Sequence, residues 1–190
     1  MTSFLARRAV RVLRKAGVEL RGGMSDDELD HVEKRLGFTF AADHRALLTM
    51  VLPVGPGWMD WRLDTDDHLK AALGWAIDGV LYDVERNDFW PKSWGVAKPE
   101  DLDEKLILAR KNLQSVPTLV PFYMEGCVPA GWAEPGAPVV KAFQTVEYRG
   151  SDIANFLERT LGDKSTPLGG ELARIPFWTD LAEGAWSADL

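Results

Sequence analysis

The chain has 190 residues, of which 46% are hydrophobic and 27% are charged, and its formal net charge is −7. These values predict one globular domain that can hold a core without a metal or a disulfide, and they exclude wholesale disorder. Cys127 is the only cysteine, so no disulfide can form within the chain. A lone cysteine is typical of a reducing compartment, and we therefore predict a cytoplasmic protein.

The charge is spread unevenly along the sequence. Residues 1–24 carry six basic residues and one acid, which leaves the rest of the chain strongly acidic. An acidic body repels phosphates, so we do not expect nucleic acid as the main ligand. It fits a basic protein partner, or simply solubility. No stretch approaches the roughly 20 apolar residues of a membrane span, so no stable membrane insertion is expected.

Residues 3–16 predict an amphipathic helix, because Leu5, Ala9, Val12 and Leu13 share one stripe and the arginines lie mostly opposite. The arginines also interrupt any apolar core of a signal peptide. Such a basic helix could lie on an anionic membrane or on an acidic partner. We favour a simpler interpretation, in which the apolar stripe docks the helix on the acidic body.

Two further helices are predicted before residue 55. Ser25 and Glu28 have the spacing of a capping box, and Gly37 can adopt the left-handed conformation that ends a helix. A third helix is expected at 43–51, closed by Pro53.

The rest of the chain mixes strand and helix patterns. We predict a strand at 58–63, a short helix capped by Asp64 or Thr65 that ends at Leu73, a strand at 80–84, and a helix from Pro99 to about Gln114. Further strands are expected at 118–124, 137–144 and 145–148, followed by a helix from Ser151 or Asp152 to Leu161. Pro117 and Pro121 confine the strand at 118–124 to a sheet edge, or the prolines themselves to strand ends.

Helices come first, strands lie in the middle and a helix follows, which is unlike an alternating βαβ series. The predicted class is α+β, with a central, mostly antiparallel or mixed sheet flanked by N-terminal and C-terminal helices. We divide the chain into a basic helix at 1–20, an α+β domain at 21–162 and a C-terminal extension at 163–190. The extension can hold a short helix from Pro176 to Trp186.

Residues that could perform chemistry are few. His31, His44 and His68 have no paired spacing, and HExxH, CxxC and phosphate-loop motifs are absent. We therefore predict no metal site, no cofactor and no catalytic residue. Cys127 could be a nucleophile beside a histidine, but an inert thiol is the favoured interpretation.

Acidic residues gather between positions 64 and 88. Asp64, Asp66 and Asp67 could form a metal-ligand cluster with His68, although the favoured explanation is that acids are common at the start of a helix. Asp83 and Glu85 would share one face of the predicted strand, where a solvated face explains them better than an acid–base pair. As the surface that binds a protein partner we predict Asp64, Asp66, Asp67, Asp83, Glu85 and Asp88.

Large aromatic residues also gather in this region: Trp58, Trp61, Trp75, Phe89, Trp90 and Trp94. Packing in the core is the favoured interpretation. An exposed subset would instead anchor an interface, because Trp and Tyr dominate interface hot spots.

Short fragments spread over residues 20–162 resemble, in order, the SUKH superfamily of the Smi/Knr cell-wall-regulator type. They lie at 23–25, 28, 32–33, 35–38, 43–48, 53–55, 61–62, 79–85, 87–90, 94–95, 117–123, 137–140, 144–145 and 148–152. The resemblance implies an α+β fold and a protein-binding role. Many bacterial members are thought to be immunity proteins that neutralise toxins of nuclease or deaminase type, and eukaryotic members are scaffolds and regulators.

The chain departs from this pattern at two places. Residues 124–129 replace a Gly-His-Arg-Tyr-Leu-Pro stretch that is usual in bacterial members, and Val146 stands where an aspartate is usual. The function we expect is a non-catalytic immunity protein. A regulatory scaffold, an uncharacterised hydrolase-like enzyme and a membrane-associated protein stay open as alternatives.

Overall fold

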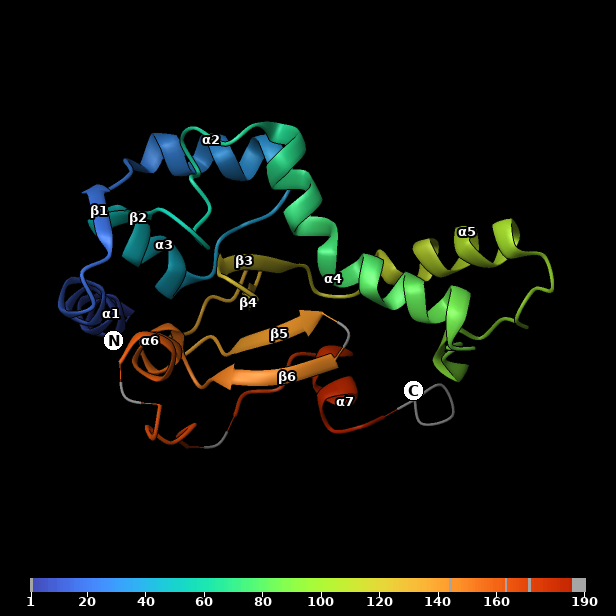
Figure 1. Ribbon diagram of the computed structural model, residues 1–190. Coiled ribbons are helices and arrows are strands. Elements are labelled where there is room, and N and C mark those ends of the chain that lie inside the picture. The colour runs from blue at the N-terminus through green and yellow to red at the C-terminus, as the bar shows by residue number, and fades with distance from the viewer. Residues whose placement is uncertain (1, 144, 163, 171, 186–190) are drawn as a thin grey trace.

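The computed structural model, shown in Figure 1, describes residues 2–143, 145–162, 164–170 and 172–185. At its centre lies a four-stranded antiparallel sheet in the order β3-β4-β5-β6. Its strands are β3 (Leu119–Tyr123), β4 (Gly126–Pro129), β5 (Val139–Phe143) and β6 (Thr145–Gly150). A separate two-stranded sheet pairs β1 (Glu19–Gly22) with β2 (Val51–Val54). The class is α+β with a central sheet and flanking helices, as predicted.

One face of the central sheet packs against α3 (Ala42–Met50) and α6 (Ile153–Leu161), and α1 (Thr2–Lys15) packs against these two helices. Ala6, Ala9 and Leu13 of α1 are fully buried in the same core, which also contains Phe122 of β3. The basic first helix is therefore docked on the body by its apolar stripe. α2 (Asp26–Leu36) lies outside these helices, over a smaller core of its own.

The other face of the sheet is covered by α4 (Asp66–Arg86) and α7 (Trp178–Ala182), and α5 (Leu102–Leu113) packs against α4. Figure 1 shows that α4 crosses the sheet, bends and continues beyond it beside α5, so these two helices project from the body. A short 3-10 helix, η1 (Lys92–Trp94), lies between them in the chain. The indole Nε1 of Trp178 donates to the carbonyl oxygen of Pro117 at 2.7 Å and ties α7 to the sheet region.

The predicted helix boundaries at Ser25 and Gly37 are confirmed. Ser25 and Glu28 form both hydrogen bonds of the capping box, and Gly37 takes a φ of 75° at the end of α2. Asp152 caps α6 by accepting from the N–H of Asn155 at 2.8 Å. Asp101 caps α5, so this helix begins after Pro99 and not at it.

Two predicted strands are wrong. Trp58 makes only an isolated bridge with Tyr123, and residues 61–63 form a turn. Residues 80–84 belong to α4, where Val80 and Val84 continue the buried stripe begun by Leu69. Tertiary burial along one helix side therefore overrides the strand propensity of this apolar run.

Strands predicted at 118–124 and 137–148 are present, and β3 lies at the sheet edge as its prolines require. Gln144 lies outside the described residues. Pro53 lies inside β2, so α3 ends before it at Met50. Strands β1 and β4 were not predicted. The expected last helix is shorter than 176–186, and Trp186 lies outside the described residues. Among the described residues, no helix combines the length and apolar character needed to cross a membrane.

Candidate functional site

An apolar pocket of about 150 Å³ opens between α4 and the edge of the central sheet. α4 contributes Trp75 and Ala76, and the turn between β3 and β4 contributes Met124 and Glu125. The floor comes from three neighbouring strands: Pro121, Cys127 and Ala142. Pro121 and Cys127 are paired across β3 and β4, so their side chains lie on the same face of the sheet.

Two exposed, large apolar side chains, Trp75 and Met124, line this pocket, and a third, Tyr82, lies further along α4. Trp75 is 55% exposed, and Tyr82 and Met124 are each 60% exposed. Trp75 and Tyr82 are seven residues apart in α4, so they lie on one side of the helix about 10 Å apart. We call Trp75, Tyr82, Met124 and the pocket the Trp75 face. Of the aromatic residues predicted from the sequence, Trp61, Phe89 and Trp90 are buried, whereas Trp75 is exposed.

Met124 is held in a costly backbone conformation. Its φ is 52°, in the left-handed region, which costs a residue with a side chain about 1–2 kcal/mol. Its N–H donates to the carbonyl oxygen of Gly57 at 2.7 Å, and the ring of the preceding Tyr123 stacks on Trp58 with 4.3 Å between centroids. The surrounding structure thus fixes a turn that exposes an apolar side chain, a pattern that points to function.

Charged groups border the Trp75 face. Asp78 is exposed on the same side of α4, between Trp75 and Tyr82, and lies 3.9 Å from Arg110. Glu125 is 3.1 Å from the ammonium nitrogen of Lys141. Aromatic anchors inside a polar border are typical of protein–protein interfaces.

The six acids predicted as a binding surface do not form one surface. Asp64, Asp66 and Asp67 lie at the start of α4, whereas the other three lie around its end, about 30 Å along a helix of 21 residues. Asp83 and Glu85 are two residues apart in a helix and point to different sides, so the shared face expected of a strand is wrong.

Most of these acids are engaged within the chain. Asp66 lies 3.0 Å from the guanidinium of Arg35, and Asp88 is paired with Lys98. Asp64 accepts from the backbone N–H of Asp60, Asp83 from the amide of Asn87, and Glu85 is paired with Arg86. They therefore form hydrogen bonds and ion pairs within the chain, whereas Thr65 caps α4, and they can steer a partner more readily than they can anchor one.

The groups weighed for catalysis lie apart. Burial raises the pKa of Cys127 to about 12, so its thiol stays protonated at neutral pH. His44 packs edge-on against Phe122, which points to the opposite face of the sheet from Cys127. Burial lowers the pKa of His44 to about 3. His31 and His68 are exposed, and in the described part of the chain no three His, Cys, Asp or Glu side chains could hold a metal ion.

Tyr82 and Met124 were missed from the sequence. Tyr82 would have been paired with Trp75 if residues 66–86 had been read as one helix. No sequence signal identifies Met124, because its exposure depends on the contact of its backbone with Gly57.

Comparison with known proteins assigns no family. No protein-family model, curated protein or solved structure matches the chain. The resemblance to the SUKH superfamily therefore stays a prediction from residues.

Proposed function

We propose that the chain is a non-catalytic protein-binding domain that contacts its partner through the Trp75 face. One observation carries the proposal: two large apolar side chains, Trp75 and Met124, line an apolar pocket while each is more than half exposed, and Met124 is held out by a strained turn. Exposed Trp and Tyr give large contact area at low entropic cost, which is why they anchor interfaces.

The charge around this face favours a basic partner. Residues 60–104, which include α4, carry 12 acidic and five basic residues, so their net charge of −7 equals that of the whole chain. An acidic field speeds the encounter with a basic protein, whereas desolvated apolar anchors hold the complex. The six predicted acids, which are too far apart to form one contact surface, would therefore act by attracting a basic partner.

In its most concrete form, the proposed domain is a cytoplasmic immunity protein that masks a basic toxin domain of nuclease or deaminase type. Support comes from the family resemblance over residues 20–162 together with the acidic and apolar character of the Trp75 face. The partner would place an apolar side chain in the pocket and basic side chains near Asp78 and Glu125.

Growth protection tests this proposal. A candidate toxin domain encoded beside the gene is expressed in a sensitive host with the wild-type chain, with Trp75→Ala or with Leu63→Ala. Leu63 is 72% exposed and lies in the turn before α4, so it is a matched apolar control away from the pocket. We expect protection by the wild type and by Leu63→Ala, and loss of protection by Trp75→Ala at equal protein level. Equal protection by all three would refute the role of the Trp75 face.

A further inference from the structure

Three of the four arginines of α1 differ from the other arginines of the chain. Nine arginines, with Arg8 of α1 among them, lie within ion-pair distance of a carboxylate, and Arg159 donates to the carbonyl oxygen of Thr166. Arg7, Arg11 and Arg14 form no ion pair within the described residues, and all three are exposed. The unpaired arginines thus gather on a single helix.

These side chains form one narrow stripe. At 100° per residue, Phe4, Arg7, Arg11, Arg14 and Lys15 fall within about 100° of the helix circumference. Phe4 is 53% exposed, and the stripe faces away from the buried Ala6, Ala9 and Leu13. Because α1 is docked on the body, the stripe is presented on a fixed helix and needs no folding to form.

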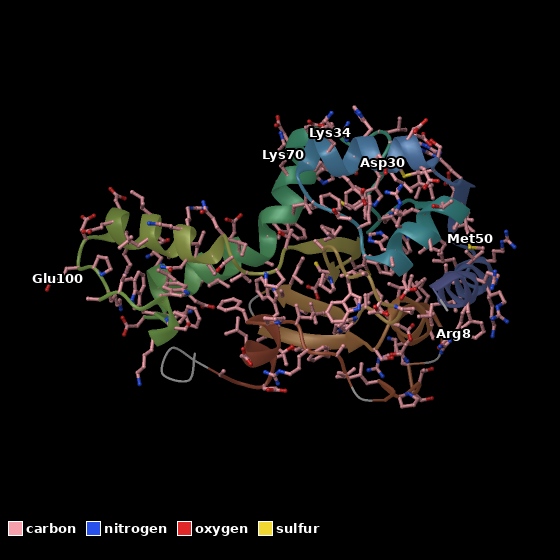
Figure 2. The ribbon with its side chains drawn as sticks, turned by 180° about the vertical axis from the view of Figure 1, so that it is seen from behind. Arg8, Asp30, Lys34, Met50, Lys70 and Glu100 are labelled. Carbon is pink, nitrogen blue, oxygen red and sulfur yellow. The ribbon has the colours of Figure 1, made fainter. Side chains whose placement is uncertain are left out.

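The basic stripe and the projecting ends of α4 and α5, which carry part of the acidic excess, lie at opposite ends of the molecule. Figure 1 places α1 at one end and the projecting α4 and α5 at the other. In the reverse view of Figure 2, Arg8 marks the α1 end and Glu100 the tip of the projection. Charges are screened beyond a Debye length of about 8 Å at physiological salt, so the acids of the projecting end contribute little at a surface that touches α1.

We propose that this stripe binds an anionic lipid surface from one side, without insertion of the helix. Basic side chains attract anionic headgroups, and an exposed phenylalanine in the same stripe can enter the boundary between headgroups and acyl chains. A convex helix can lie along a flat surface. Single-stranded nucleic acid is instead bound along a basic groove, whereas the stripe lies on the convex surface of a helix. The proposal does not depend on the Trp75 face.

Vesicle flotation of the full chain provides the test. Vesicles of phosphatidylcholine alone are compared with vesicles that contain 30% phosphatidylglycerol, at low and at physiological salt. The test variant is Arg7→Glu/Arg11→Glu/Arg14→Glu. The control variant is Lys34→Glu/Lys92→Glu/Lys111→Glu, which changes the net charge equally at exposed lysines elsewhere. Circular dichroism and thermal melting confirm that each variant is folded. If the test variant is not folded, Arg7→Gln/Arg11→Gln/Arg14→Gln is compared with Lys34→Gln/Lys92→Gln/Lys111→Gln, which again changes the net charge equally.

We expect the wild type to bind the vesicles that contain phosphatidylglycerol and not those of phosphatidylcholine alone, and to bind more weakly at physiological salt than at low salt. The test variant should bind the anionic vesicles at least about tenfold more weakly than the wild type. The control variant should stay within about threefold of the wild type. Failure of the wild type to bind, or equal loss in both variants, would overturn the proposal. Tighter binding to a 20-base-pair DNA duplex than to the vesicles, lost only in the test variant, would overturn it in favour of nucleic acid.

Discussion

Met124 combines a left-handed backbone with an exposed apolar side chain, so its two properties can be separated by substitution. Met124→Ala keeps the backbone strain and removes the anchor, whereas Met124→Gly removes both. We expect Met124→Gly to be about 1 kcal/mol more stable than Met124→Ala, because glycine adopts a positive φ without steric cost. Urea denaturation of the two variants measures this difference.

Binding should follow the side chain and not the strain. Both Met124 variants are expected to bind the partner at least about tenfold more weakly than the wild type, since a central apolar anchor commonly contributes more than 1 kcal/mol. If Met124→Gly gained stability and kept full affinity, Met124 would have no part in the interface.

His44 should make the fold sensitive to acid. It is fully buried among Phe40, Trp61 and Phe122, which lowers its pKa from 6.5 to about 3. The unfolded chain therefore binds a proton below pH 6.5 that the folded chain excludes, and stability falls as the pH decreases from 6.5 towards 3. At pH 5 the loss is about 2 kcal/mol relative to pH 7.

Substitution isolates this contribution. Burial raises the pKa of Asp43, so protonation of Asp43 favours the folded state and acts in the opposite sense. His44→Leu should therefore lose less stability between pH 7 and pH 5 than the wild type, whereas the exposed His31→Gln control should follow the wild type. Parallel pH profiles for the wild type and His44→Leu, measured by urea denaturation, would contradict the account.

At the scale of single residues, the sequence predicts helix caps well and the exposure of side chains poorly. Ser25, Glu28 and Gly37 act within one turn of the chain, so local spacing is sufficient to identify them. The exposure of Trp75 and the burial of Trp61 depend on which elements pack over them, and no local pattern distinguishes the two.

At the scale of elements, α4 shows how tertiary burial decides between structures. The run at 80–84 is rich in β-branched and aromatic residues, and Gly74 and Gly79 interrupt the helical pattern before it. The chain is nevertheless helical through both glycines, because Ala76, Val80 and Val84 bury one side of it against the core. This helix places Trp75 and Tyr82 on one face, so the error in the predicted strand also concealed the site.

Arg62 joins three elements and should be sensitive to a conservative change. Its guanidinium contacts both carboxylate oxygens of Glu28 at 2.7 and 2.9 Å and the carbonyl oxygens of Gly22 and Gly23, each at 2.7 Å. Lysine cannot reproduce this geometry, so we expect Arg62→Lys to lower the free energy of unfolding by about 1–2 kcal/mol.

Arg21→Lys provides the matched control. Among the described residues Arg21 forms one ion pair, with Asp60, and its side chain is more exposed than that of Arg62, so its replacement should change stability by less than about 0.5 kcal/mol. Thermal and urea denaturation measure both variants. Equal stability of Arg62→Lys and the wild type would show that these hydrogen bonds do not hold β1 and α2 to the turn before α4.

At the scale of the whole molecule, the two ends differ in charge and in exposed side chains. The docked α1 presents unpaired arginines, and the region of α4 presents the acidic excess with the Trp75 face. The order of helices and strands was sufficient to predict the α+β class. It could not predict this polarity, which arises from the placement of α1 and of the projecting α4 and α5 around the sheet.

Calorimetric titration tests the protein-binding account most directly. The toxin domain that the wild type neutralises is titrated into the wild type, Trp75→Ala and Leu63→Ala, each verified as folded. We predict that Trp75→Ala raises the dissociation constant at least about tenfold and that Leu63→Ala leaves it within about twofold of the wild-type value. Unchanged affinity of Trp75→Ala, with the wild type binding normally, would contradict the account and place the interface elsewhere on the molecule.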